Sequence, residues 1–113
     1  MATISSRRLA ETYFACVRAR DAEGLGALFA EDGVLTLPDS REFVGPKAVA
    51  ELYAGMFAGT APRPQPMTFI EAGLACAVEL EARFDDGRVT YAADFFRLGE
   101  DGLIRRLDIY AKR

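Results

Sequence analysis

Apolar residues recur with the period of an α-helix through the first part of the chain. On the expected buried face of a first helix lie Leu9, Tyr13, Cys16 and Val17. Ser5 or Ser6 can cap this helix, which is expected to end near Arg20. A short second helix, capped by Asp21, is expected to extend through Phe29.

A short strand and a third helix are predicted next. Residues 34–37 have the composition of a strand, and Pro38 is expected to end it. After a loop or short hairpin, Pro46 at the first helical position begins the third helix. The buried face of that helix is expected to hold Val49, Leu52, Tyr53, Met56 and Phe57. Residues 60–66 contain three of the five prolines and are predicted to form a loop.

The second half of the chain alternates apolar and polar residues with period two, the pattern of strands that are buried on one face. Asp86-Gly87 is typical of a hairpin turn, and residues 99–102 predict another turn. The strands are expected at residues 67–72, 74–84, 89–98 and 103–111. Helices followed by a meander of strands indicate an α+β fold, in one domain of residues 1–113.

Composition removes several classes of function. The 113 residues carry 14 basic and 17 acidic side chains, so the net charge of −3 argues against nucleic acid and anionic membranes as partners. The chain has no histidine, which excludes Ser-His and Cys-His catalysis and every histidine-containing metal site. We therefore expect no metal and no cofactor. The sequence begins without the apolar segment of a signal peptide and contains no membrane-length apolar run.

The two cysteines also bear on location. Cys16 and Cys76 are far apart, match no CxxC spacing and lie in apolar periodic stretches. They are expected to be reduced core thiols of a cytoplasmic protein. The alternative is a disulfide in a secreted domain.

Asp94 is unusual for its place in the sequence, because the strand around it is too apolar for a solvated carboxylate. With period two, Asp94 shares a face with Ala92, Phe96 and Leu98. If that face lines an apolar pocket, desolvation raises the pKa of Asp94 and keeps the carboxyl protonated, so that it can donate a hydrogen bond. The alternative is a buried aspartate that bonds the backbone or Arg97.

Three segments together resemble a known family. They are residues 13–38 with the stretch Ala27-Leu28-Phe29-Ala30-Glu31-Asp32, residues 45–54, and Asp94-Phe95-Phe96-Arg97-Leu98 before a glycine-rich turn. In order and spacing they resemble the NTF2-like superfamily, specifically its SnoaL-like and ketosteroid-isomerase-like group. The resemblance implies three helices packed on a strongly curved, mostly antiparallel sheet. This arrangement forms a cone with a pocket at its open end.

The resemblance also implies roles for individual residues. Tyr13 and Asp94 match the two hydrogen-bond donors of the ketosteroid isomerase oxyanion hole, and Tyr53 matches a second tyrosine that supports the first. From spacing alone, the role of an ordinary core aromatic is favoured for Tyr13, and it is the paired match with Asp94 that makes the two roles comparable. The position of the family's general base is Leu37, which cannot accept a proton. Asp39 is the nearest carboxylate that could replace this base.

Two further carboxylates, Glu42 and Glu71, are less direct candidates for the base, and all three acids could simply be solvated. Contacts with a small hydrophobic ligand are expected from Leu37, Tyr53, Phe57, Val78, Phe96 and Leu107. In a related limonene-epoxide-hydrolase pattern, Arg97 would work on the same face as Asp94, but no clear second aspartate completes that set.

Three classes of function therefore stay open. The first is an isomerase or a polyketide cyclase that moves protons on a hydrophobic ketone, and a cyclase of this group needs only one acid/base aspartate. The second is a non-catalytic module that binds a small molecule, and the third is an accessory subunit.

Many members of the family form dimers through the convex face of the sheet. In this chain Tyr91, Phe95 and Tyr110 have outward parity, and an exposed patch of such residues favours a homodimer.

Overall fold

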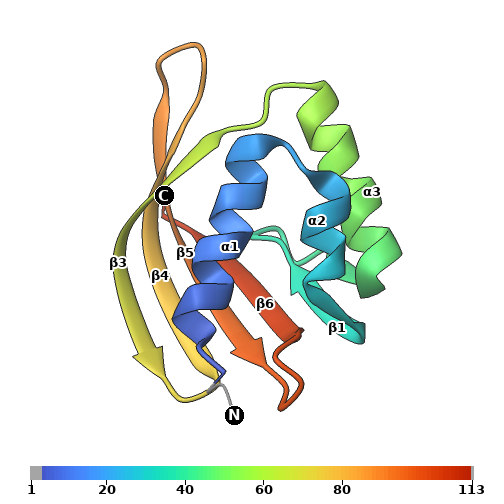
Figure 1. The fold of residues 1–113 in the computed structure, drawn as a ribbon. Helices are drawn as coiled ribbons and strands as arrows, with labels where there is room; N and C mark the ends of the chain where they lie inside the picture. The colour runs from blue at the N-terminus through green and yellow to red at the C-terminus, as the bar shows by residue number, and fades with distance from the viewer. Residues whose placement is uncertain (1–3, 113) are drawn as a thin grey trace.

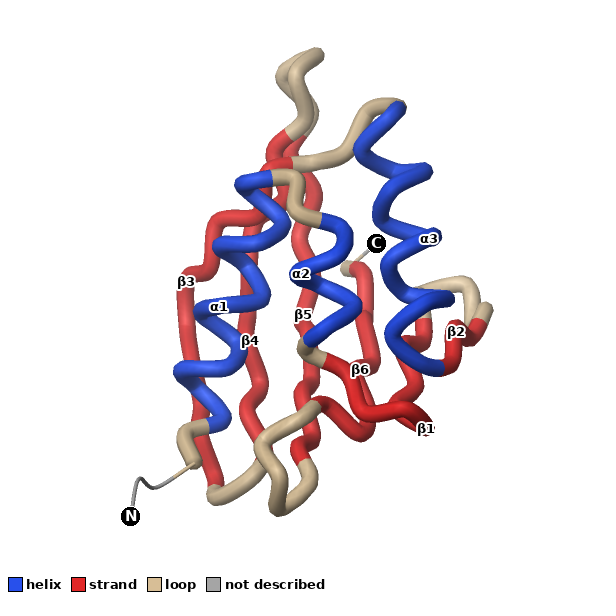
Figure 2. Tube along the Cα trace, turned by 45° about the vertical axis from the view of Figure 1, so that its right-hand side comes forward, coloured by secondary structure: helices blue, strands red, loops and turns tan. Residues whose placement is uncertain are grey.

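The computed structural model describes residues 4–112 as three helices packed on one face of a six-stranded sheet (Figures 1 and 2). The helices are α1 (Ser6–Ala19), α2 (Ala22–Ala27) and α3 (Gly45–Ala58). The strands are β1 (Phe29–Thr36), β2 (Glu42–Val44), β3 (Arg63–Ala72), β4 (Ala75–Arg83), β5 (Val89–Leu98) and β6 (Ile104–Ala111). The α+β class predicted from the sequence is confirmed.

Local signals in the sequence set the helix starts. The Ser5 side chain accepts a hydrogen bond from the backbone N–H of Arg8, which caps α1 as predicted. Asp21 caps α2 by accepting from the N–H of Gly24. Pro46 lies in the first turn of α3, where its missing N–H costs nothing. None of the helices among residues 4–112 is long and apolar enough to span a membrane.

The sheet has the strand order β2-β1-β6-β5-β4-β3, and β1 and β6 form its parallel pair. The other neighbouring strands run antiparallel. Register shifts occur in β3 after Pro66 and at the end of β5 after Arg97. Such irregularities bend strands, and the sheet curves around the helices in Figure 1. The concave face holds the buried residues of β4, which are Cys76, Val78, Leu80 and Ala82.

Two regions differ from the prediction, and in the first of them the strand expected at residues 34–37 spans Phe29–Thr36. The second helix ends at Ala27, because Phe29 already pairs with Ile104 as the first residue of β1. Tertiary pairing here outweighs the helical spacing of the apolar residues. The other difference is that β3 begins at Arg63 and includes Pro64 and Pro66. Prolines are tolerated there because β3 is an edge strand and one side of it needs no backbone donor.

Candidate functional site

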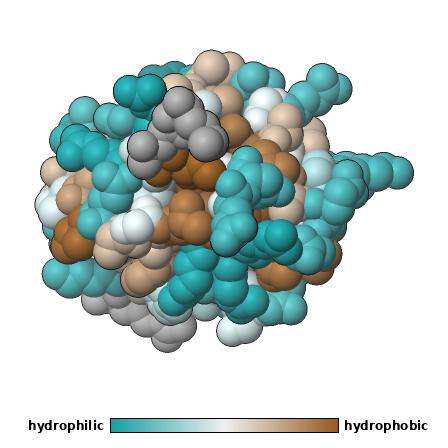
Figure 3. Space-filling view, turned by 60° about the horizontal axis from the view of Figure 1, so that its bottom comes forward, coloured by the Kyte–Doolittle hydropathy of each residue, from teal (hydrophilic) through white to brown (hydrophobic). Residues whose placement is uncertain are grey.

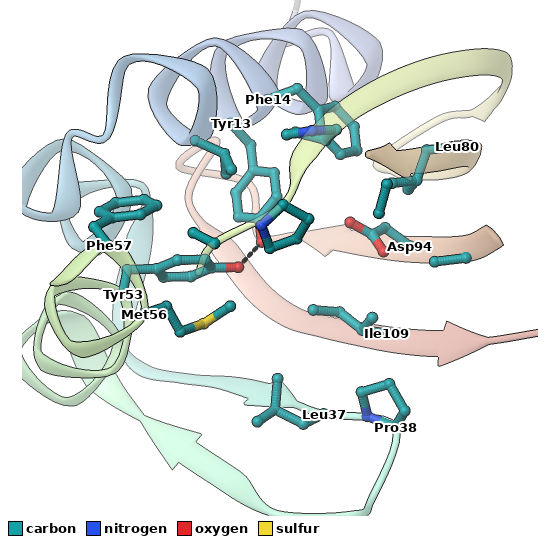
Figure 4. A pocket seen from close by; sticks show the side chains of 16 residues that line it. Tyr13, Phe14, Leu37, Pro38, Tyr53, Met56, Phe57, Leu80, Asp94 and Ile109 are labelled. Atoms are coloured by element: carbon teal, nitrogen blue, oxygen red, sulfur yellow. Dashed lines mark hydrogen bonds between the residues drawn. The ribbon is translucent and has the colours of Figure 1, made fainter. Parts of the chain in front are cut away.

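A cavity of about 200 Å³ lies between the helices and the concave face of the sheet (Figure 4). From the helices it is lined by Tyr13, Phe14, Val17, Tyr53, Met56 and Phe57. From the strands and connections it is lined by Leu37, Pro38, Ala61, Pro62, Pro64, Leu80, Ala82, Ala92, Asp94 and Ile109. Asp94 and the two tyrosines are the lining residues with polar side chains, so the wall is otherwise hydrocarbon or aromatic.

Three elements bring the polar groups of the cavity together. Tyr13 comes from α1, Tyr53 from α3 and Asp94 from β5, and these residues are 2%, 4% and 4% exposed. The two tyrosine hydroxyls form a hydrogen bond with each other, drawn as a dashed line in Figure 4. The Asp94 side chain lies on the sheet side of the same cavity. The helical spacing of Tyr13 and the strand parity of Asp94 thus lead to one site.

Burial controls the protonation of this group of side chains. Desolvation raises the pKa of Asp94 to about 7, and no hydrogen bond or opposite charge among residues 4–112 offsets that effect. Burial also raises the pKa of Tyr13 and the pKa of Tyr53 above the ordinary tyrosine value. Both tyrosines are therefore neutral donors near pH 7, while Asp94 is poised between its acid and its carboxylate.

Arg97 does not take part in the site, contrary to the expectation that it shares a face with Asp94. It lies three positions further along β5, so period-two alternation points it to the opposite, convex face. There its guanidinium pairs with the Asp108 carboxylate at 3.1 Å and lies over the ring of Phe95. An Asp94–Arg97 catalytic pair is therefore ruled out by the strand geometry.

Asp39 lies outside the cavity lining, although the sequence made it the nearest replacement for a base at Leu37. Its carboxylate accepts hydrogen bonds from the backbone N–H and the side chain of Arg41. These bonds lower the pKa of Asp39, and its side chain is 56% exposed. A solvated carboxylate that is already paired is a weak proton acceptor, so the position gives no support to the role suggested for it.

Glu42 and Glu71, the other two candidate acids, also form their contacts outside the cavity. Glu42 lies on β2 and pairs with Arg106 at 3.7 Å. Glu71 bonds the start of α1, where it accepts from Ser5 Oγ, Ser6 Oγ and the backbone N–H of Arg7. Neither lines the cavity. Among residues 4–112, Asp94 is consequently the carboxyl group that the cavity offers to a ligand.

The residues expected to contact a ligand divide into two groups. Leu37, Tyr53 and Phe57 line the cavity. The expectation for the other three needs correction, because Val78, Phe96 and Leu107 are fully buried and absent from the lining. The reason is clearest for Phe96, which lies on the concave face but packs against the rings of Tyr13 and Phe14, at centroid distances of 5.2 and 5.9 Å. Helix α1 thus covers this part of the face.

Sequence reasoning missed part of the lining. Leu80 and Ile109 were not expected in the lining, and they lie against the cavity beside their cross-strand partners Ala92 and Asp94. The signal available for these residues was their position in the period-two pattern, which places them on the inward face of the sheet. The connection that contributes Ala61 and Pro62 had no such signal, since it follows α3 without a periodic pattern.

The described residues offer no obvious metal site. Within residues 4–112, no three side chains of cysteine, aspartate or glutamate gather closely enough to hold a metal ion. What the cavity supplies chemically is a pair of hydroxyl donors and one acid that can gain or lose a proton.

Comparison with known proteins places the chain in a family. No curated protein matches the sequence significantly. A proposed ketosteroid isomerase from Kribbella flavida is 22% identical with a TM-score of 0.83, over 96% of this chain and 78% of that one. An NTF2-like protein from Mesorhizobium loti is 19% identical with a TM-score of 0.82, over 96% and 91% of the two chains.

A proposed polyketide cyclase from Sinorhizobium meliloti is 19% identical with a TM-score of 0.80, over 90% of this chain and 93% of that one. At these identities the three structures share the fold. The model of the SnoaL-like domain matches residues 10–107, which is most of the sequence. The chain therefore belongs to the SnoaL-like domain family and has the NTF2-like fold.

Proposed function

We propose that the protein transfers protons on a small hydrophobic ketone, with Asp94 as its single acid/base group. The observation that carries the proposal is the position of Asp94, a buried carboxyl that faces an apolar cavity beside two tyrosine hydroxyls. Enzymes tune carboxyl groups toward neutral pKa values for this kind of work. The pKa of Asp94, raised to about 7 by burial, matches that requirement.

The proposed reaction uses the three polar groups in order. A ketone oxygen accepts a hydrogen bond from the hydroxyl pair, in which one hydroxyl donates to the other and the second stays free to donate outward. The Asp94 carboxylate removes a proton from the carbon next to the carbonyl. Negative charge moves onto the ketone oxygen, where the tyrosine donor stabilises the enolate. The protonated Asp94 then returns the proton to carbon.

A single acid/base fits this cavity better than the two-group arrangement of ketosteroid isomerases. In that arrangement a protonated aspartic acid donates to the enolate oxygen and a second carboxylate removes the proton. Leu37 stands where the resemblance puts the second carboxylate, and no other acid among residues 4–112 lines the cavity. The polyketide cyclase pattern, with one aspartate, needs no more groups than the cavity holds.

The test is exchange of the α-protons of cyclohexanone for deuterium in heavy water, followed by proton NMR. The protein should accelerate exchange above the buffer rate, and the rate should rise with pH through a midpoint near 7 as Asp94 ionises. Exchange at the buffer rate across that range, with the ketone bound, would contradict the proposal.

A second candidate is a binding module without catalysis, and the leucine at position 37 is the observation that favours it. An oxyanion site without a base binds a carbonyl or a phenol but does little to it. In that case phenol binding would persist while exchange stays at the buffer rate. The same two measurements therefore separate the two candidates.

Introducing the missing base gives a further prediction. If the site lacks a working base, as in the second candidate, Leu37→Asp is expected to increase isomerisation of a one-ring β,γ-unsaturated ketone by about 100-fold or more, the usual contribution of a positioned base. If Asp94 already acts as the base, the gain is expected to be much smaller. Leu37 lines the cavity, so the new carboxylate would face the ligand. The measurement is the growth of the conjugated-enone absorbance. Leu37→Asn is the matched control, and an equal gain in that variant would contradict the explanation.

We also propose a second copy of the chain as partner for the convex face of the sheet. Tyr91 and Tyr110 are 44% and 59% exposed there, and large exposed aromatic groups favour burial in an interface. Figure 3 shows another part of the surface, the lower end of the molecule in Figure 1, where hydrophobic atoms lie between hydrophilic ones. Light scattering at micromolar concentration should give twice the chain mass, and a monomer mass would contradict this proposal.

A further inference from the structure

The size of the cavity restricts the ligand more sharply than the family resemblance does. We propose that the site takes a compound with a single ring, one carbonyl or phenolic oxygen and a short substituent, and that it excludes four-ring steroids. This inference rests on the proposed function, because it assumes that the polar end of the cavity receives an oxygen atom. It adds a substrate class that the reaction alone does not specify.

Volume is the first argument. The cavity measures about 200 Å³. An engineered cavity of about 150 Å³ in another protein is filled by benzene, which has six carbon atoms. By proportion, this cavity accepts roughly eight non-hydrogen atoms. Pockets for drug-sized ligands begin at about 300 Å³. A four-ring ligand would therefore leave most of its rings outside.

The wall formed by β3, β4 and the connection after α3 gives the second argument, because this side has little freedom to move outward. Pro64 is paired with Ala82 in the sheet, and its ring fixes its backbone. Ala61 and Leu80 are only 5% and 4% exposed, so each is held by surrounding atoms. Widening this side would require separating β3 from β4 or moving the connection that follows α3.

The arrangement of polar and apolar groups gives the third argument. Tyr13, Tyr53 and Asp94 carry all the polar side-chain atoms of the lining, and no basic residue lies among the lining residues. A ligand can therefore satisfy hydrogen bonds through one oxygen only, while the rest of its surface meets hydrocarbon. A second polar group on the ligand would be buried without a partner, which is costly. The fitting class is a neutral compound with one polar end.

Phe57 is the largest of the purely apolar side chains that α3 contributes to the cavity wall. It is half-buried, lies next to Tyr53 with ring centroids 5.7 Å apart, and lines the cavity. Truncation to alanine would lengthen the space available to a ligand. Phe69 offers a matched control, because it is also half-buried and packs against the core but does not line the cavity.

The experiment measures dissociation constants by NMR titration at about pH 6, where Asp94 is mostly protonated. The probes are 4-ethylphenol, 2-naphthol and a four-ring steroid phenol. The unmodified protein should bind 4-ethylphenol at least about tenfold more tightly than the steroid phenol. Phe57→Ala should shift the preference toward 2-naphthol by about tenfold, whereas Phe69→Ala should leave the order of affinities unchanged.

Tighter binding of the steroid phenol to the unmodified protein would overturn the proposal. So would tighter binding of phenyltrimethylammonium than of 4-ethylphenol, because the site would then select a cation. These results are independent of the exchange reaction. If the order of affinities holds but no α-proton exchange occurs, the proposed function fails and the ligand class stands. If exchange occurs but the four-ring phenol binds best, the ligand class fails alone.

Discussion

Replacing Asp94 with asparagine is expected to slow α-proton exchange of cyclohexanone by about 100- to 10,000-fold, the usual contribution of a positioned acid or base. Asparagine keeps the shape and the polarity of the side chain but cannot accept the proton. Asp94 has no substitute, because no other acid among residues 4–112 lines the cavity. The measurement is the exchange rate by proton NMR at saturating ketone, with folding checked by circular dichroism.

Asp39→Asn is the control for this experiment. Asp39 is paired with Arg41 outside the cavity lining, so its replacement should leave the exchange rate unchanged. Tyr13→Phe should lower the rate without shifting the pH midpoint, because it weakens the oxyanion donor and leaves the base in place. If Asp94→Asn kept the full rate, the base would have to be another group and the proposed mechanism would be wrong.

The second large expected effect is a dependence of stability on pH. Its sign follows from the direction in which the pKa of Asp94 is shifted. The pKa of Asp94 is about 7 in the folded protein, against about 3.9 in an unfolded chain. Between these values the folded state binds the proton and the unfolded state does not, so the free energy of unfolding falls as pH rises. A difference of about three pKa units corresponds to about 4 kcal/mol as an upper estimate.

Urea denaturation between about pH 5 and pH 8 would measure about two thirds of this change, because the change begins near the unfolded pKa of about 3.9. We expect the free energy of unfolding to fall with pH over that window, and Asp94→Asn should remove most of the slope. Backbone hydrogen bonds lower the pKa values of Asp39, Glu71 and Asp86, so these carboxyls titrate below the window. A parent protein that is more stable at pH 8 than at pH 5 would contradict burial of an ionisable Asp94.

The three polar residues of the site could be predicted from the sequence. Asp94 is an exception to a simple pattern of apolar residues, and the two tyrosines follow such a pattern. Asp94 is an acid on the apolar face of a strand, and alternation alone puts it on the buried side. Tyr13 and Tyr53 follow the buried stripes of their helices. The family resemblance then brought the three residues together, which spacing along the chain could not do.

The apolar lining was harder to predict. Period-two alternation predicts which face of the sheet a residue occupies, but not whether a helix packs over that residue. Phe96 and Leu80 both point to the concave side, but α1 packs on Phe96 while Leu80 meets the cavity. That difference depends on where a helix crosses the sheet, a tertiary property. The prolines of β3 were misleading for a similar reason, since only the strand order identifies β3 as an edge.

Asp94 is a buried acid poised near neutral pH in an apolar cavity. A carbon-detected NMR titration of its side-chain carboxyl, assigned by comparison with Asp94→Asn, tests this most directly. We expect a midpoint near 7, as burial without a compensating partner requires. A midpoint at or below about 3.9, the value for an unperturbed aspartate, would mean a solvated or ion-paired carboxyl and would contradict the account.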